Sequence, residues 1–139
     1  IVHNSAISLY LIITITVLSV AKQNLILQLS FDFALHIIQL YQVLKGQKEY
    51  VLSKQLLRSG TSIGANVEEA IAAQSRKDFI SKMNIASKEA RETRYWLRLL
   101  TKSQIVKYDY SAYLDKIDSI VNVLTAIVKS TQETDKKNS

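Results

Sequence analysis

Residues 53–72 read SKQLLRSGTSIGANVEEAIA, and this stretch decides the fold. Leucines and charged residues flank a run of small residues that contains Gly60 and Gly64. Glycine costs about 1 kcal/mol in a helix interior relative to alanine, so two glycines here need a structural reason. Because they are four residues apart, they lie on one helix face, where a second backbone can approach closely. The stretch therefore predicts close helix–helix packing. A phosphate-binding loop is the alternative, but it lacks the lysine and the preceding strand of a P-loop.

The composition of the chain favours a single helical domain. Of the 139 residues, 47% are hydrophobic and 22% are charged, as in an ordinary soluble domain. The chain has no proline, so it can be nearly all helix, and it has no cysteine, which excludes disulfides and thiolate metal sites. Its net charge of +6 permits an acidic partner such as nucleic acid.

Residues 6–21, AISLYLIITITVLSVA, are almost wholly apolar and carry no charge. They fall short of the roughly 20 residues that span a bilayer, and no basic residue precedes them as in a signal peptide. Three interpretations stay open: a membrane-associated or signal-like segment, an extra helix or strand packed on the domain, and sequence upstream of the natural start. Charge begins at Lys22. We therefore predict an apolar extension over 1–21, a helical domain over 22–131 and a disordered polar tail over 132–139.

Four segments show the apolar spacing of bundle helices, alternating between three and four residues. They cover about residues 24–44, 49–73, 76–102 and 110–130. Gly46 is a natural stop for the first helix, Ser75 with Asp78 resembles a capping box for the third, and Asp109 is a candidate N-cap for the fourth. The predicted seams are Leu27, Phe31, Ala34, Ile38 and Tyr41; Leu52, Leu56, Ser59, Ile63, Asn66 and Ala70; Phe79, Met83, Ala86, Ala90, Thr93, Leu97 and Leu100; and Tyr110, Leu114, Ile117, Val121, Leu124 and Val128. Short links between long helices predict an all-α, up-down-up-down antiparallel four-helix bundle.

Two of these helices carry more apolar residues than one seam uses. The surplus comprises Leu35, Ile37, Leu40 and Leu44 on the first helix and Ile120, Val123 and Ile127 on the fourth. Large exposed apolar patches mark interfaces, so we predict a homo-oligomer. In the competing explanation, the N-terminal apolar segment covers this surface within one chain.

The third helix holds most of the charge imbalance. Lys88, Arg91, Arg98 and Lys102 fall opposite its seam, with Tyr95 among them. A basic stripe with an aromatic residue suits phosphate contact and base stacking, and the alternative is an ordinary solvated face. The candidate nucleic-acid-binding residues are Arg76, Lys77, Lys88, Arg91, Arg94, Arg98 and Lys102.

A second set of residues is assigned to helix packing: Arg58, Ser59, Gly60, Gly64, Asn66 and Glu69. Asn66 falls on the seam, so we expect it to be buried and to fix register, with a ligand site between helices as the alternative. Histidine occurs only at positions 3 and 36, and the Glu-x-x-His pairs of a di-iron bundle are absent. We therefore predict no metal, no cofactor and no catalytic site. Ion pairs with arginines explain the glutamates of the second and third helices more simply than acid–base catalysis.

The segments LSKQLLRSGTSIGANVEEA and SRKDFISKMNIASKEARETRYWLRLL resemble a known family. It comprises the bacterial four-helix-bundle proteins encoded within intervening sequences of 23S ribosomal RNA genes, once labelled S23 ribosomal proteins. The resemblance covers residues 25–128, and residues 1–21 depart from it. It implies a bundle that assembles into a ring, typically a homopentamer, without catalytic activity and with suspected nucleic-acid binding. The accessory proteins of diversity-generating retroelements, basic pentamers that bind a reverse transcriptase and nucleic acid, are similar.

Together, the residues and the resemblance predict a cytoplasmic, non-enzymatic oligomer that binds RNA or DNA through basic helix faces. The alternative is a protein-interaction scaffold, such as an accessory subunit of a reverse transcriptase. We do not expect a membrane partner.

Overall fold

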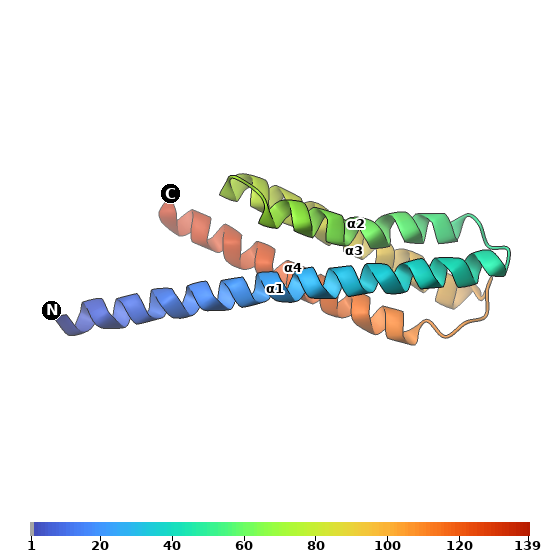
Figure 1. The fold of residues 1–139 in the computed structure, drawn as a ribbon, viewed down its shortest axis with the longest axis horizontal. Helices are drawn as coiled ribbons and strands as arrows, with labels where there is room; N and C mark the ends of the chain where they lie inside the picture. The colour runs from blue at the N-terminus through green and yellow to red at the C-terminus, as the bar shows by residue number, and fades with distance from the viewer. Residues whose placement is uncertain (1) are drawn as a thin grey trace.

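The computed structural model describes residues 2–139 as four helices with no strand among them. They are α1 (Val2–Gly46), α2 (Leu52–Ile71), α3 (Arg76–Ser103) and α4 (Ser111–Asn138). Each helix packs against two neighbours in the cyclic order α1, α2, α3, α4, and the α1–α4 seam is the least extensive. Both termini lie at one end of the bundle, and α1 extends past the other helices there (Figure 1). The predicted all-α class and the four helices are confirmed.

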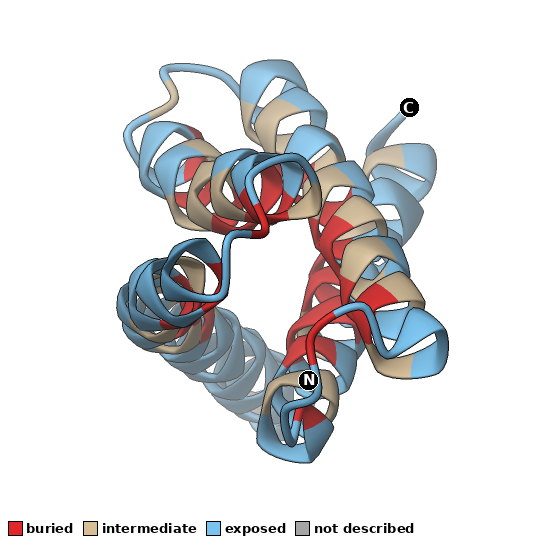
Figure 2. Ribbon diagram, turned by 90° about the vertical axis from the view of Figure 1, so that its right-hand side faces the viewer, coloured by how far each residue is buried: buried red, intermediate tan, exposed pale blue. Residues whose placement is uncertain are grey.

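The core lies along the axis of the bundle, on the helix faces that turn toward one another (Figure 2). The fully buried large side chains are Phe33, Ile26, Ile37, Leu40, Leu44, Leu56, Ile63, Met83, Leu97, Leu100, Ile117 and Ile120. The predicted seam of α3 is confirmed except at its first position: Phe79 is half-buried, and the buried positions are Met83, Ala86, Ala90, Thr93, Leu97 and Leu100. Ile120 and Ile127 of the predicted surplus are also buried, so α4 uses them in the core.

The seam predicted for α1 is wrong. Phe31 and Ile38 are 58% and 41% exposed, whereas Ile26, Phe33 and Ile37 are buried. This helix is apolar on almost every side, so its own spacing does not indicate which side faces the core. The contact with α2 determines which side of α1 is buried.

The two glycines of α2 set that contact, as their spacing predicted. A Cβ at Gly60 would lie 2.9 Å from Cγ2 of Ile37, and one at Gly64 would lie 3.4 Å from the carbonyl oxygen of Ser30. Both neighbours belong to α1, so the small-residue face of α2 lets α1 approach closely. The packing role predicted for this face fits the observed geometry.

Several helix ends differ from the prediction. The first helix begins at Val2 rather than near residue 24, because residues 6–21 continue α1. The second begins at Leu52, after the Glu49 carboxylate accepts hydrogen bonds from the backbone N–H groups of Leu52 and Ser53, at 2.9 and 2.6 Å. This acceptor satisfies donors that have no partner within the helix.

The start of α3 is as predicted, since the Ser75 hydroxyl accepts a hydrogen bond of 3.1 Å from the backbone N–H of Asp78. The start of α4 is one residue later than expected. Tyr110 occupies the N-cap position, and the Asp109 carboxylate accepts from the backbone N–H of Ser111 at 3.0 Å. The polar tail that we expected to be disordered is helical as far as Asn138.

Candidate nucleic-acid interface

On α3, two acidic side chains lie on the side that faces α2, away from most of the basic side chains. Glu89 and Glu92 point toward α2, where the Arg58 guanidinium pairs with both, at 3.4 Å from Glu89. The Trp96 indole N–H also donates to Glu92, at 3.2 Å. The hydrogen bond from Arg58 lowers the pKa of the Glu92 carboxyl below its ordinary value, although partial burial opposes the shift. Both glutamates therefore pair on the α2 side of α3 and do not neutralise the cations on its other side.

The seven cations predicted to bind nucleic acid divide into two sets. Arg76 forms an ion pair with Asp135, and Arg94 lies 3.4 Å from Asp118, so α4 partly neutralises both. Arg91 donates to the Thr125 hydroxyl at 3.2 Å, which leaves its charge uncompensated. The remaining four are exposed and have no ion pair within residues 2–139: Lys77, Lys88, Arg98 and Lys102. Together with Arg91 they form what we call the α3 ridge, and Tyr95, which is 53% exposed, stands among them.

A groove between α3 and α4 adjoins the α3 ridge. Its volume is about 310 Å³. Its walls are Asn84, Ser87, Lys88 and Arg91 from α3, and Thr125, Val128, Lys129 and Gln132 from α4. Sequence reasoning missed Lys129, because its position opposite Lys88 depends on the register between antiparallel helices. The groove combines cations with hydroxyl and amide groups, which are the donors that phosphate contacts use.

The residues assigned to packing have varied roles. Ser59 is buried and accepts a hydrogen bond of 2.9 Å from the Thr93 hydroxyl, which joins α2 to α3. Glu69 is on the surface and pairs with Lys82 at 2.6 Å. The prediction for Asn66 is wrong, since it is half-buried and its amide donates to the Ser62 carbonyl of its own helix at 2.8 Å. Because this bond lies within α2, it does not fix the register between helices.

A second hollow is apolar and lies between α1 and α2. It has a volume of about 360 Å³ and is lined by Leu27, Ser30, Phe31, Ala34, Leu35, Ile38, Thr61, Gly64, Ala65 and Glu68. Phe31, Leu35 and Ile38 are 58%, 47% and 41% exposed, so the rim of this hollow is an exposed apolar surface. Surfaces of this kind mark interfaces between proteins.

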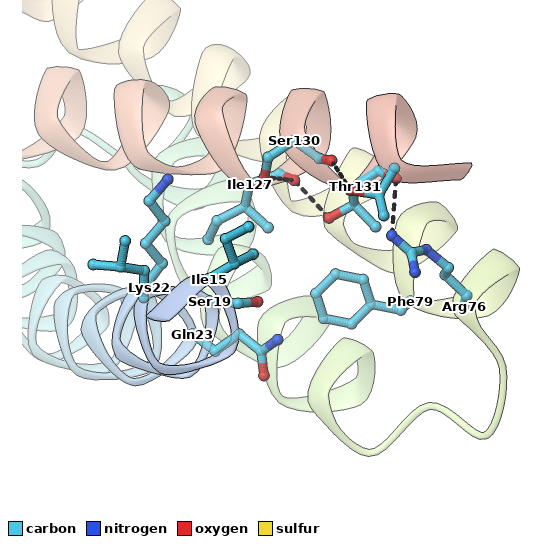
Figure 3. A pocket seen from close by; sticks show the side chains of 11 residues that line it. Ile15, Ser19, Lys22, Gln23, Arg76, Phe79, Ile127, Ser130 and Thr131 are labelled. Atoms are coloured by element: carbon cyan, nitrogen blue, oxygen red, sulfur yellow. Dashed lines mark hydrogen bonds between the residues drawn. The ribbon is translucent and has the colours of Figure 1, made fainter. Parts of the chain in front are cut away.

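A third cavity lies at the end of the bundle where α1 extends past its neighbours (Figure 3). Ile15 and Lys22 of α1 face Phe79 of α3 and Ile127 of α4 across it. Arg76 closes one side by donating to the Thr131 carbonyl at 3.2 Å. The cavity marks the level at which the four-helix core ends.

No group of three or more His, Cys, Asp and Glu side chains that could hold a metal ion occurs within the described chain. His36 lies on α1, where its Nδ1 is 3.0 Å from Nζ of Lys116. Since an ammonium can only donate, Nδ1 accepts this bond.

Comparison with known proteins places these features in a family context. The model of the family described as 23S rRNA-intervening sequence protein matches residues 22–126. The chain also resembles a crystal structure of a protein of unknown function from the S23 ribosomal protein family of Bacteroides thetaiotaomicron. The two are 48% identical with a TM-score of 0.74, and the match covers 78% of this chain and 98% of the other. A search of curated proteins finds no match.

Proposed function

Because this chain belongs to the 23S rRNA-intervening sequence protein family, we propose that it is a non-enzymatic, oligomeric protein of the cytoplasm that binds the backbone of RNA or DNA. The interface is the α3 ridge together with the α3–α4 groove. The chain shares its fold, at 48% identity, with a relative whose function is itself unknown. The proposal therefore rests on the charges of this chain.

The observation that carries the proposal is the sorting of charge across α3. The α3 ridge contains five cations, and Glu89 and Glu92 of the same helix pair with Arg58 of α2 instead of with them. At 28 residues, α3 is about 42 Å long, so the α3 ridge can follow several successive phosphates. An ordinary solvated face would carry acidic and basic side chains together. Arg76 and Arg94 show that arrangement, since each pairs with an aspartate of α4.

Recognition on this surface would be of the nucleic-acid backbone. Lysine and arginine contacts to phosphates position a protein but carry no sequence information. Tyr95 adds a ring on which an unpaired base can stack, and such stacking tolerates any base. We therefore expect binding with little sequence preference. Stacking on Tyr95 would increase the affinity for single-stranded RNA but not for a duplex, whose bases are paired.

The oligomer is the second part of the proposal. Phe31, Leu35 and Ile38 form an apolar stripe beside the small residues Gly64 and Ala65, so a side chain from a second copy could fill the hollow between α1 and α2. The resemblance implies a ring of five copies. Light scattering tests this directly: the chain should form a discrete oligomer that Leu35→Glu dissociates, whereas Lys54→Glu, an exposed change on α2, should leave it intact.

The test of nucleic-acid binding is a charge-reversal pair. Lys88→Glu with Arg91→Glu should weaken binding to a labelled single-stranded RNA at least tenfold in fluorescence anisotropy, because both residues line the groove. The matched control is Lys54→Glu with Lys107→Glu, which makes the same charge change at exposed positions off the α3 ridge. Equal loss in both pairs would mean that net charge alone drives binding, and the interface would be wrong.

A protein partner is the alternative, and the apolar hollow between α1 and α2 favours it. If the chain forms its oligomer but does not bind RNA or DNA at low salt, the scaffold function becomes the better account. An accessory subunit of a reverse transcriptase is one form of it, and co-purification with such an enzyme would be the next measurement.

A further inference from the structure

The N-terminal half of α1 is a free apolar helix. Every described side chain from His3 to Lys22 is exposed, and Tyr10, Ile15 and Val17 are 71%, 65% and 61% exposed. It does not fold back on the bundle, which contradicts the interpretation that it covers surplus apolar surface within one chain. Water is an unfavourable environment for so much apolar surface, so something else must surround it.

No single helix of a partner could cover this segment. Leu9, Tyr10, Leu11, Ile12 and Ile13 follow one another, and at 3.6 residues per turn they point in every direction around the axis. A helix that docks on a partner shows an apolar stripe on one side, whereas one that is apolar all round suits a core or a membrane. Hydrocarbon can surround a helix on all sides at once.

Two hydroxyl groups of the segment are satisfied within the helix. The hydroxyls of Thr14 and Thr16 each donate a hydrogen bond of 2.9 Å, to the carbonyls of Tyr10 and Ile12 respectively. The helix also pairs its own backbone groups, so neither set needs water. From Asn4 to Ala21 the chain runs 18 residues without a charge, which is about 27 Å of helix and close to the thickness of a bilayer core. α1 is long and apolar enough to cross a membrane by length and composition.

The bundle end from which the segment emerges carries cations. Lys22 and Arg76 line the cavity there (Figure 3), and Lys136 and Lys137 lie near the end of α4. Lysine and arginine beside an apolar helix favour the cytoplasmic side and attract anionic headgroups. Residues 15–19 of α1 share that cavity with Thr131 and Thr134 of α4, so this part of the segment would lie at the level of the headgroups and the residues before it deeper.

We propose that residues 4–21 of α1 insert into a lipid bilayer and hold the bundle at the membrane surface. The inference concerns a different surface from the α3 ridge and does not depend on nucleic-acid binding. It revises our expectation, from the sequence, that the chain has no membrane partner.

The experiment is flotation of the full chain with vesicles of phosphatidylcholine and phosphatidylglycerol. The chain should float with the vesicles and stay with them after a high-salt wash. Ile12→Asp with Ile13→Asp should reduce the floated fraction at least tenfold, because charges near the middle of a bilayer-inserted helix are costly. Both side chains are more than half exposed, so the bundle should keep its helical circular dichroism.

The matched control is Tyr50→Asp with Val51→Asp, two exposed apolar residues in the α1–α2 link, which should float like the parent chain. Three results would overturn the proposal. The parent chain could remain unfloated, it could leave the vesicles in high salt, or the Ile12 and Ile13 variant could float equally well. Binding that is lost in high salt would mean that surface cations, not the apolar segment, hold the chain on the vesicles. A soluble oligomer that does not bind vesicles would mean that a second copy of the chain covers the segment.

Discussion

Replacing each of the two glycines of α2 with alanine should have opposite effects on stability. A Cβ at Gly60 would lie 2.9 and 3.0 Å from Cγ2 and Cγ1 of Ile37, closer than carbon atoms pack. Ile37 is fully buried and β-branched, so it cannot easily rotate away. A Cβ at Gly64 would meet only the backbone and hydroxyl of Ser30, at 3.4–3.5 Å, which is close to ordinary contact.

The magnitudes follow from two terms. Each change gains about 1 kcal/mol of helix propensity. Overpacking at Gly60 costs about 1–3 kcal/mol. We therefore expect Gly60→Ala to lower the free energy of unfolding by about 0–2 kcal/mol, and Gly64→Ala to raise it by up to about 1 kcal/mol.

The assay is urea unfolding of both variants, followed by circular dichroism. Ile37→Ala removes both clashing carbons, so it should cost less in the Gly60→Ala background than in the parent chain, where it should cost about 2–5 kcal/mol. The reasoning is refuted if Gly60→Ala is at least as stable as Gly64→Ala, or if the effects of Gly60→Ala and Ile37→Ala simply add.

Three further predictions concern polar contacts, each measured as a free energy of unfolding. Glu49→Gln should cost about 0.5–2 kcal/mol because its carboxylate caps α2. Burial raises the pKa of Glu49, but hydrogen bonds from backbone N–H groups lower it more, so its net pKa is below the ordinary value. Its contribution should be complete above the ordinary carboxyl pKa and disappear as pH falls through the lower folded value, where parent and variant should converge. Thr93→Val should cost about 1–2 kcal/mol by removing the buried bond to Ser59, and Thr101→Val, whose hydroxyl bonds only within its own helix, should cost less. Arg58→Met should cost at most about 1 kcal/mol and lose that effect in high salt, because the arginine is half exposed.

How far the sequence predicts the fold depends on how its charges are placed. On α3, charged residues separate the apolar positions, so the buried face from Met83 to Leu100 could be identified without a structure. On α1, apolar residues occupy nearly every position, and Phe31 and Phe33 could not be told apart. The packing of Ile37 against Gly60 determines which side of α1 is buried. This contact depends on how two helices fit together, so the sequence of one helix does not reveal it.

The candidate site shows the same limit. The period of one helix predicted that Lys88, Arg98 and Lys102 face solvent, and they are exposed. It could not show that Asp118 and Asp135 of α4 would pair with Arg94 and Arg76, or that Lys129 would face the groove, because these depend on the register between α3 and α4.

The cap of α2 was missed for a related reason. Gly46 predicted the end of α1 correctly, but the backbone then turns through Lys48, whose φ is 64°, before Glu49 reaches the first N–H groups of α2. A left-handed residue at lysine has no sequence signal of the kind that glycine gives.

The central claim is that the α3 ridge binds nucleic-acid phosphates, and the salt dependence of RNA binding tests it most directly. With duplex RNA as the ligand, a plot of log affinity against log salt should have a slope of about −4.5 if all five cations of the α3 ridge contact phosphates. Lys88→Ala with Arg91→Ala removes two of them and should change the slope to about −2.7. A slope near zero, or the same slope in both proteins, would contradict the account.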